Sequence, residues 1–378
     1  MSNDMMSHFS DIEDPRIERQ KKYTLQELLF VILTGCLCGI TNYVDMEDFA
    51  QAHEAWYKTK LGYKNGIPSH DTLGRVMRLI LPEKFKECFA EWTKTLHEKN
   101  NDVVAIDGKN LRHSFDNGDT KSSIYMVSAW SCNSGLVLAQ EKVDEKSNEI
   151  TAIPKLLELL DIEGCLVTID AMGTQYEIAD QIVEKGGDYL LALKGNQGNL
   201  HEDVRLFFED KQLMGETVQD NFEDVSADHG RVETRKCTII YDTDWLRDRH
   251  KQFNSIASII KIESLREFKN KTSSEAEAET RYYISSRVMT AKRALEASRN
   301  HWQIENKLHW ILDMNLDEDI SRVRKDHAPE NMAIVRHVAL NMINYFKTSR
   351  KLKISFRRIQ NKLAWNEREL DSILRQAF

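Results

Sequence analysis

The sequence contains few of the residues that mark disordered, membrane-spanning or disulfide-rich proteins. Proline accounts for only five of the 378 residues, and no low-complexity tract is present. With 41 % hydrophobic and 30 % charged residues, the composition is that of a globular protein large enough for two or three domains. The longest apolar run, Leu28 to Ile40, has thirteen residues and includes one threonine and two glycines. Because a transmembrane helix needs about 20 residues, we expect a buried core helix there and no membrane partner.

Cysteine is also scarce and scattered, which predicts no disulfide framework. Of the six cysteines, only Cys36 and Cys38 are close together, and no further Cys or His stands near them. This C-x-C pair allows two interpretations, a zinc site or two buried thiols, and its apolar surroundings favour the buried thiols. The acidic N-terminus lacks the basic-then-apolar pattern of a signal peptide, so we expect a cytoplasmic protein.

A surplus of positive charge is missing as well. The net charge of −8 argues against a protein that coats nucleic acid non-specifically, because phosphate binding normally requires a basic surface. The charge is unevenly distributed: residues 347–378 hold nine Lys and Arg against three acids, a balance of +6, so the other 346 residues carry −14. A basic tail on an acidic body fits a tail that grips phosphates while carboxylates hold metal. A solvated, charged helix explains the same pattern.

The first hundred residues are expected to be helical. L-Q-E-L-L-F-V-I-L has apolar residues at helical spacing, and Ser69 is the expected N-cap of S-H-D-T-L-G-R-V-M-R-L-I, which resembles half of a helix-turn-helix. Pro82 is expected to open another helix. One face of that helix carries the apolar residues Phe85, Cys88, Phe89 and Trp92. Residues 1–100 are therefore predicted to be an N-terminal helical domain, with DNA binding and plain packing both open as its role.

From Val103 onward the hydrophobic period becomes that of strands. The segments V-V-A-I-D, S-I-Y-M-V-S-A-W and G-L-V-L-A-Q-E-K-V predict a meander of three strands. A helix capped by Ser147 or Asn148 follows, then strand L-V-T-I-D, a second helix and strand D-Y-L-L-A-L-K. This β-β-β-α-β-α-β order is that of ribonuclease-H-like folds, in which the first and fourth strands are central neighbours. Residues 101–196 are predicted to be the first part of such an α/β core, a mixed sheet flanked by helices.

The second half of the chain is expected to interrupt this core and then complete it. Residues 197–280, with charged loops and short alternating strands, are predicted to be a β-rich insertion. Strand R-Y-Y-I-S-S then leads into a long helix from about Thr290 to Asp313, and another helix lies near 330–346. We assign 281–346 to the second part of the core. Residues 347–378 are predicted to be a basic C-terminal helix, spanning about 355–376.

Acidic residues stand at the ends of two predicted core strands. Asp107 follows V-V-A-I and Asp170 follows L-V-T-I, so the neighbouring first and fourth strands bring the two carboxylates together. Either aspartate alone is explained by capping the next turn, but the pair favours catalysis. Glu305, in the predicted helix R-N-H-W-Q-I-E-N-K-L-H-W, supplies a third acid. Such oxygen ligands suit Mg²⁺ or Mn²⁺, and two ions about 4 Å apart stabilise both the attacking and the leaving oxygen in phosphodiester chemistry.

Other side chains near these acids allow more than one interpretation. His301, Glu305 and His309 share one face of an α-helix, as zinc ligands would. However, the H-E-x-x-H zinc pattern is absent and a glutamate facing two aspartates already explains Glu305. Trp302 and Trp310 are expected in the core rather than as base-stacking platforms. Four cations are candidate DNA-phosphate contacts, with plain exposed charge as the alternative: Lys109, Lys194, Arg299 and Lys307.

A series of motifs resembles one known family. The motifs are A-I-D-G-K-N-L-R-H-S, D-E-K-S-N-E-I-T-A-I-P, T-I-D-A-M-G-T-Q, L-A-L-K-G-N-Q-G, D-H-G-R-V-E-T-R, R-Y-Y-I-S-S and R-N-H-W-Q-I-E-N-K-L-H-W-I-L-D. They look like the successive signatures of the bacterial insertion-sequence transposases known as H-repeat-associated (Rhs-linked) proteins. The N-terminal D-P-R and N-G-I-P-S-H-D-T stretches match too, so the resemblance spans nearly the whole chain in the right order.

This resemblance implies a DDE transposase with a ribonuclease-H-like core and divalent-metal catalysis, its three acids falling at Asp107, Asp170 and Glu305. It implies an enzyme that binds terminal repeats in double-stranded DNA, cleaves the ends and joins the freed 3′-hydroxyls to target DNA. We expect a homodimer or higher oligomer on DNA, at the nucleoid of a bacterium when bound. Two alternatives stay open: a catalytically idle or domesticated DNA-binding relic, and a structure-specific nuclease that cuts without joining.

Overall fold

A single nine-stranded mixed sheet organises the part of the chain that the structure describes. This computed structural model describes residues 8–112, 114, 123–144, 148–228, 231–268 and 277–377. The strands are β1 (Val103–Leu111), β2 (Ile124–Ser131), β3 (Leu136–Lys142), β4 (Leu166–Ile169), β5 (Asp188–Leu193), β6 (Gln219–Asp228), β7 (Arg231–Ile240), β8 (Ser258–Phe268) and β9 (Glu277–Ser285). Their order across the sheet is β3-β2-β1-β4-β5-β9-β8-β7-β6.

Parallel pairing is confined to the centre of this sheet. β1 pairs with β4 from Val103↔Leu166 to Ile106↔Ile169, and β4 pairs with β5 in the same direction. The pairs β1–β2 and β2–β3 are antiparallel, so the predicted meander is confirmed. The predicted neighbourhood of the first and fourth strands is confirmed too.

Helices cover both faces of the central strands. α7 (Glu149–Leu159) and α8 (Tyr176–Glu184) pack on one face, and α12 (Ala291–His301) crosses β1, β4 and β5 on the other. The strands supply both layers because successive side chains point to opposite faces: Val104 and Val167 belong to the core under α7 and α8, whereas Val103 and Leu166 contact the α12 side. Asn148 caps α7 by accepting a hydrogen bond from the backbone N–H of Ile150, whereas Ser147 lies outside the described residues.

The insertion differs from the short strands and charged loops that we expected. It contains α9 (Asn199–Glu209), α10 (Lys211–Glu216) and α11 (Asp244–Arg249), and β6 to β8 are ten or eleven residues long. Through β9, which pairs with β5, it extends the core sheet instead of forming a separate one. The helical signal was present in the spacing of Leu200, Val204, Phe207 and Phe208, all buried.

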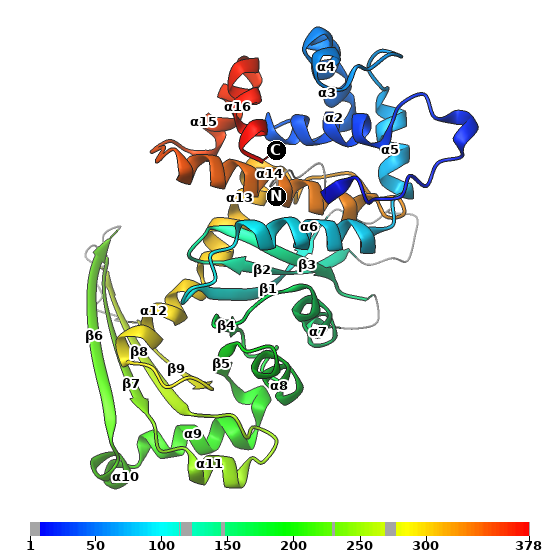
Figure 1. The fold of residues 1–378 in the computed structure, drawn as a ribbon. Helices are drawn as coiled ribbons and strands as arrows, with labels where there is room; N and C mark the ends of the chain where they lie inside the picture. Colours follow the sequence, from blue (N-terminus) through cyan, green and yellow to red (C-terminus); the bar gives the residue numbers. More distant parts are fainter. Residues whose placement is uncertain are drawn as a thin grey trace.

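The two ends of the chain share one helical core, at the opposite end of the sheet from the insertion (Figure 1). The N-terminal helices are α2 (Leu25–Leu37), α3 (Tyr43–Ala52), α4 (Glu54–Leu61), α5 (His70–Leu79) and α6 (Pro82–Leu96). The C-terminal helices are α14 (Ala328–Ser349), α15 (Phe356–Trp365) and α16 (Glu367–Ala377). α14 is buried along most of its length and contacts α2, α5, α6 and β3. No helix in the described ranges is long and apolar enough to cross a membrane.

Several local predictions in these helices are confirmed, and one is wrong. Ser69 precedes α5, Pro82 opens α6, and the apolar stripe of α6 is buried. Cys36 and Cys38 are buried free thiols, and burial raises the pKa of Cys36 to about 11. The single helix expected over 355–376 is split, because Asn366 is extended and its side chain accepts a hydrogen bond from the Arg368 N–H at the start of α16.

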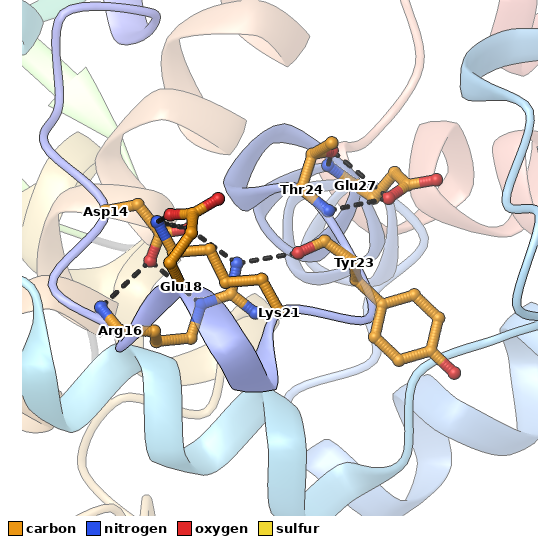
Figure 2. A network of polar contacts seen from close by, with 7 residues as sticks. All are labelled: Asp14, Arg16, Glu18, Lys21, Tyr23, Thr24 and Glu27. Atoms are coloured by element: carbon orange, nitrogen blue, oxygen red, sulfur yellow. Dashed lines mark hydrogen bonds and ion pairs between the residues drawn. The ribbon is translucent and has the colours of Figure 1, made fainter.

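The D-P-R motif fastens the N-terminal segment to α2 (Figure 2). The Arg16 guanidinium donates to both carboxylate oxygens of Asp14, at 2.9 and 2.7 Å, and to the Tyr23 carbonyl at 2.7 Å. Although burial works in the opposite direction, hydrogen bonds from Arg16 hold the pKa of Asp14 below its usual value. Directly after Tyr23, Thr24 and Glu27 form a capping box that begins α2. This motif therefore has a structural task in the N-terminal helices.

We expect Arg16→Lys to lower the free energy of unfolding by about 1 to 2 kcal/mol, because a lysine keeps the charge but loses the two-pronged contact with Asp14. Chemical denaturation of the two proteins measures this difference. The matched control is Arg19→Lys, since the Arg19 side chain is exposed and makes no hydrogen bond or ion pair within the described residues. Equal stabilities for both variants would contradict the structural role of the motif.

Candidate active site

The register of β1 on β4 sets Asp107 and Asp170 side by side. Ile106 pairs with Ile169, and each aspartate is the next residue along its strand. Neighbouring strands lie about 4.8 Å apart, so the two backbones deliver their carboxylates to the same end of the sheet. Both aspartates line a cavity of about 330 Å³ together with Glu305. The structure thus gathers the three predicted acids around one cavity.

Glycines in both aspartate motifs allow this close packing. A Cβ on Gly108 would lie 2.3 Å from the Tyr125 ring and 2.5 Å from a Glu149 carboxylate oxygen. A Cβ on Gly173 would lie 2.4 Å from Ile169. The N–H of Gly173 also donates to Asp170 Oδ1 at 3.3 Å, alongside the N–H of Met172 at 2.9 Å. The D-G-K and D-A-M-G sequences therefore hold the aspartates in place by backbone contacts.

Glu305 reaches the cavity from a helix that is not continuously α-helical. The predicted helix 290–313 consists of α12, a π-helical segment η3 (Ile304–His309) and α13 (Trp310–Asn315). The Trp310 N–H bonds to the Glu305 carbonyl five residues back, the spacing of a π-helix. One turn earlier, His301 Nδ1 and Thr168 Oγ1 are 3.1 Å apart, which ties the end of α12 to β4. This anchor sets η3 against β1.

A fourth carboxylate, Glu149, borders the site and was missed by the sequence reasoning. It is 9 % exposed and accepts a hydrogen bond from the Tyr125 hydroxyl. Burial raises its pKa, the Tyr125 bond lowers it, and the charge of Asp170 raises it further. As the first residue after the cap of α7, Glu149 looked like an ordinary first-turn acid. Only the close approach of α7 to Gly108 reveals its position.

Repulsion among these acids is visible at Asp107. Burial raises its pKa to about 7, opposed by a hydrogen bond from the Gly108 N–H and reinforced by the charges of Glu149, Glu305 and Asp170. Oxygen ligands that repel one another suit a hard divalent cation such as Mg²⁺ or Mn²⁺. Among the described residues, however, no group of three or more His, Cys, Asp or Glu is close enough to hold a metal ion. The donor chemistry therefore fits the metal, and the acids would have to move closer to enclose it.

The histidines near Glu305 do not support the alternative zinc site, and the two tryptophans near it are more exposed than predicted. His301 lines the cavity, but His309 does not; its Nδ1 is 3.8 Å from Asp107 Oδ2. Burial lowers the pKa of each histidine to about 4, so both are in the neutral form that can bind zinc, but among the described residues they do not form a group of three ligands with Glu305. The expectation that Trp302 and Trp310 lie in the core is wrong, since they are 38 % and 56 % exposed. Trp302 instead stacks against the Arg281 guanidinium.

The four predicted phosphate contacts occupy different environments. Lys194 is exposed and lines the cavity, and Lys307 is exposed with its ammonium 2.7 Å from Gln303 Oε1. Arg299 is paired with Asp224 at 3.1 Å. The Lys109 ammonium is 12 % exposed and lies among three carboxylates: Asp313 at 2.5 Å, Glu318 at 2.9 Å and Asp319 at 3.2 Å. Its charge is thus neutralised within the fold, unlike that of Lys194.

Two models of the DDE transposase family match this chain. Residues 98–342 match the family model described as "Transposase DDE domain", and residues 6–93 match the model described as "DDE_Tnp_1-associated". The chain therefore belongs to the DDE transposase family, whose domain is ribonuclease-H-like, and the predicted fold class and family are confirmed.

Relatives cover almost the full chain. "Putative protein YbfL" and "H repeat-associated putative transposase YhhI", both from Escherichia coli K12, are each 39 % identical over 98 % of this chain and 97 % of their own length. "Putative transposase YncI" from Escherichia coli O157:H7 is 38 % identical over 98 % of this chain and 94 % of its own.

Of the D-H-G-R motif, His229 and Gly230 lie outside the described residues.

In EDTA, we expect Asp107→Asn to stabilise the protein at neutral to alkaline pH. The raised pKa means that the folded state holds a proton that the unfolded state has released, so stability falls as the pH rises from 3.8 to about 7. An asparagine does not titrate and so removes this penalty. The free energy of unfolding of Asp107→Asn therefore exceeds that of the wild type by an amount that grows over that interval and levels off at about 2 to 4 kcal/mol. Chemical denaturation of wild type and Asp107→Asn across the pH range measures this difference in stability, with exposed Asp242→Asn as the control. A stability difference between wild type and Asp107→Asn that does not change with pH would refute the assigned pKa.

Proposed function

We propose that this protein is the transposase of an insertion sequence, binding terminal repeats in double-stranded DNA, cleaving the ends and joining the freed 3′-hydroxyls to target DNA. The observation that supports this most is the convergence of Asp107, Asp170 and Glu305 on one cavity in a chain of the DDE transposase family. Cleavage and joining are the same phosphoryl-transfer step with water or a 3′-hydroxyl as the nucleophile, so one acid cluster can serve both.

In this proposal the three acids hold the metal ions from two sides of the cavity. Asp107 and Asp170 would hold Mg²⁺ or Mn²⁺ from the sheet, and Glu305 from the facing helix. When bound, the ions supply Lewis-acid stabilisation of the attacking and leaving oxygens. Asp170 is oriented by two backbone N–H groups on Oδ1. Asp107 must lose its proton to bind a cation, and because its pKa is about 7, metal binding and proton release are coupled.

The assembly and its location follow from the same proposal. Both ends of an element must be held together for joining, so we propose a homodimer or higher oligomer on DNA. Its substrate places it in the bacterial cytoplasm, at the nucleoid when bound. Lys194 is exposed and lines the acid cavity, Lys307 is exposed two residues after Glu305, and both remain our candidate phosphate contacts.

The decisive variant is Asp170→Asn. We expect it to reduce both nicking at the repeat end and strand transfer by at least about 1,000-fold, because a metal-binding carboxylate is lost while the fold is kept. The assay uses a labelled duplex that carries the flanking terminal repeats, with Mg²⁺ or EDTA, and monitors cleavage, joined product and band shift. The matched control is Asp242→Asn, which changes an exposed aspartate distant in sequence from the acids.

The outcomes separate the rival functions. A wild-type protein that shifts the duplex but never cuts it is a DNA-binding relic. Cutting without a joined product identifies a structure-specific nuclease. Loss of end binding together with cleavage in Asp170→Asn would count against the assignment of Asp170 as a metal ligand.

A further inference from the structure

A second cavity lies between the N-terminal helices and the segment that follows α13. It measures about 800 Å³, compared with about 330 Å³ for the acid-lined cavity. α3 and α5 line it on one side, and residues 317–328 line it on the other. Its lining holds five Lys or Arg side chains but only two aspartates, in a chain of net charge −8. We call this cavity the basic groove.

The acids of residues 317–319 face away from the basic groove or are already bonded. Asp317 Oδ2 accepts a hydrogen bond from Thr41 Oγ1 at 3.0 Å. Glu318, only 3 % exposed, pairs with Lys109 at 2.9 Å, and Asp319 pairs with the same ammonium at 3.2 Å. These contacts fasten the start of the segment to the residues just before α3 and to β1. They also leave residues 320–325, three of which are basic, to form the wall of the groove.

The cations of the groove are largely uncompensated. Arg78 pairs with Asp326 at 2.7 Å and closes the far end of the segment. In contrast, the exposed side chains of three cations make no hydrogen bond or ion pair within the described part of the chain: Arg75, Arg322 and Lys325. Arg75 stands on α5, whereas Arg322 and Lys325 stand on the opposite wall. Unpaired cations on two facing walls form a site for an extended anion.

We propose that the basic groove binds the phosphate backbone of duplex DNA, with Arg75, Arg322 and Lys325 as the contacts. This inference rests on the proposed function, which requires a duplex end to reach the acids. Exposed cations on two elements suit a polyanion that runs along a groove, whereas a small anion would be enclosed by buried donors.

The basic groove is also connected to the acid site. Lys109, which holds Glu318 and Asp319, lies on the same face of β1 as Asp107. Two residues along a strand span about 7 Å. DNA held against residues 320–325 is therefore positioned relative to the catalytic acids by a buried ion-pair cluster.

The test is the triple variant Arg75→Ala, Arg322→Ala, Lys325→Ala. Fluorescence anisotropy with the terminal-repeat duplex in EDTA separates binding from cleavage. We expect Kd to rise about 10- to 100-fold at about 0.1 M salt, and the slope of log K against log salt to fall by about 2 to 3. A duplex of scrambled sequence should show the same fold-loss, because phosphate contacts carry no sequence information.

Three further variants serve as controls for charge removal, folding and charge retention. The variant Lys185→Ala, Lys211→Ala, Lys251→Ala removes the same charge from residues on and near α8, α10 and α11, and should change Kd by less than about twofold. The single variant Lys325→Ala, which removes one exposed side chain, should reduce the salt slope by about 1 even if the triple variant folds poorly. Arg75→Lys with Arg322→Lys should retain most of the affinity.

The results distinguish this inference from the proposed function. If the wild type binds and cleaves while the triple variant folds and binds with unchanged Kd and slope, the groove proposal is overturned and the transposase stands. If the triple variant loses binding but the wild type never cleaves, the groove stands and the catalytic proposal fails. A wild-type protein that does not bind duplex at low salt overturns the groove proposal directly.

Discussion

The parallel pairing of β1 with β4 is the constraint on which the site depends. Its register, ending at Ile106↔Ile169, places Asp107 and Asp170 next to each other although 63 residues separate them in the chain. Because side chains alternate along a strand, a slip of one residue would turn one aspartate to the opposite face. The apolar residues of both strands are buried on the two faces, which makes such a slip costly. Core packing and the placement of the two aspartates are thus set by the same residues.

Lys109 extends this constraint beyond the sheet. A lysine with 12 % exposure is stable only with strong partners, and three carboxylates from residues 313–319 supply them. Those residues follow Glu305 in the chain, so the ion-pair cluster fixes α13 and the residues just after it relative to β1. Glu305 and the basic wall of residues 320–325 are consequently held in position relative to β1, the strand that carries Asp107.

Prediction from the sequence succeeded where local chemistry determines structure. Strand periodicity, the Asn148 cap and the Pro82 helix start are local signals, and the order of strands yielded the central pair. Three features depend on tertiary contacts instead. No hydrophobic pattern in the sequence distinguishes the π-helical turn at Glu305 from an α-helix. Glu149 joins the site only through packing against Gly108. Trp302 is exposed and stacks against the Arg281 guanidinium outside the core. The helices of the insertion, in contrast, had a readable apolar spacing.

The negative net charge and a DNA substrate are compatible because charge acts locally. Coulomb interactions between exposed groups are screened within about 8 to 10 Å at physiological salt, so a phosphate responds to the nearest side chains and not to the sum over 378 residues. In residues 317–325 the acids come first and bond to Thr41 and Lys109, and two of the cations that follow, Arg322 and Lys325, are exposed. The same ordering places Glu318 and Asp319 beside Lys109 of β1, and Arg322 and Lys325 at the groove. Net charge is therefore a poor guide to partners when a buried cluster, such as that of Lys109 with three carboxylates, holds more acids than bases.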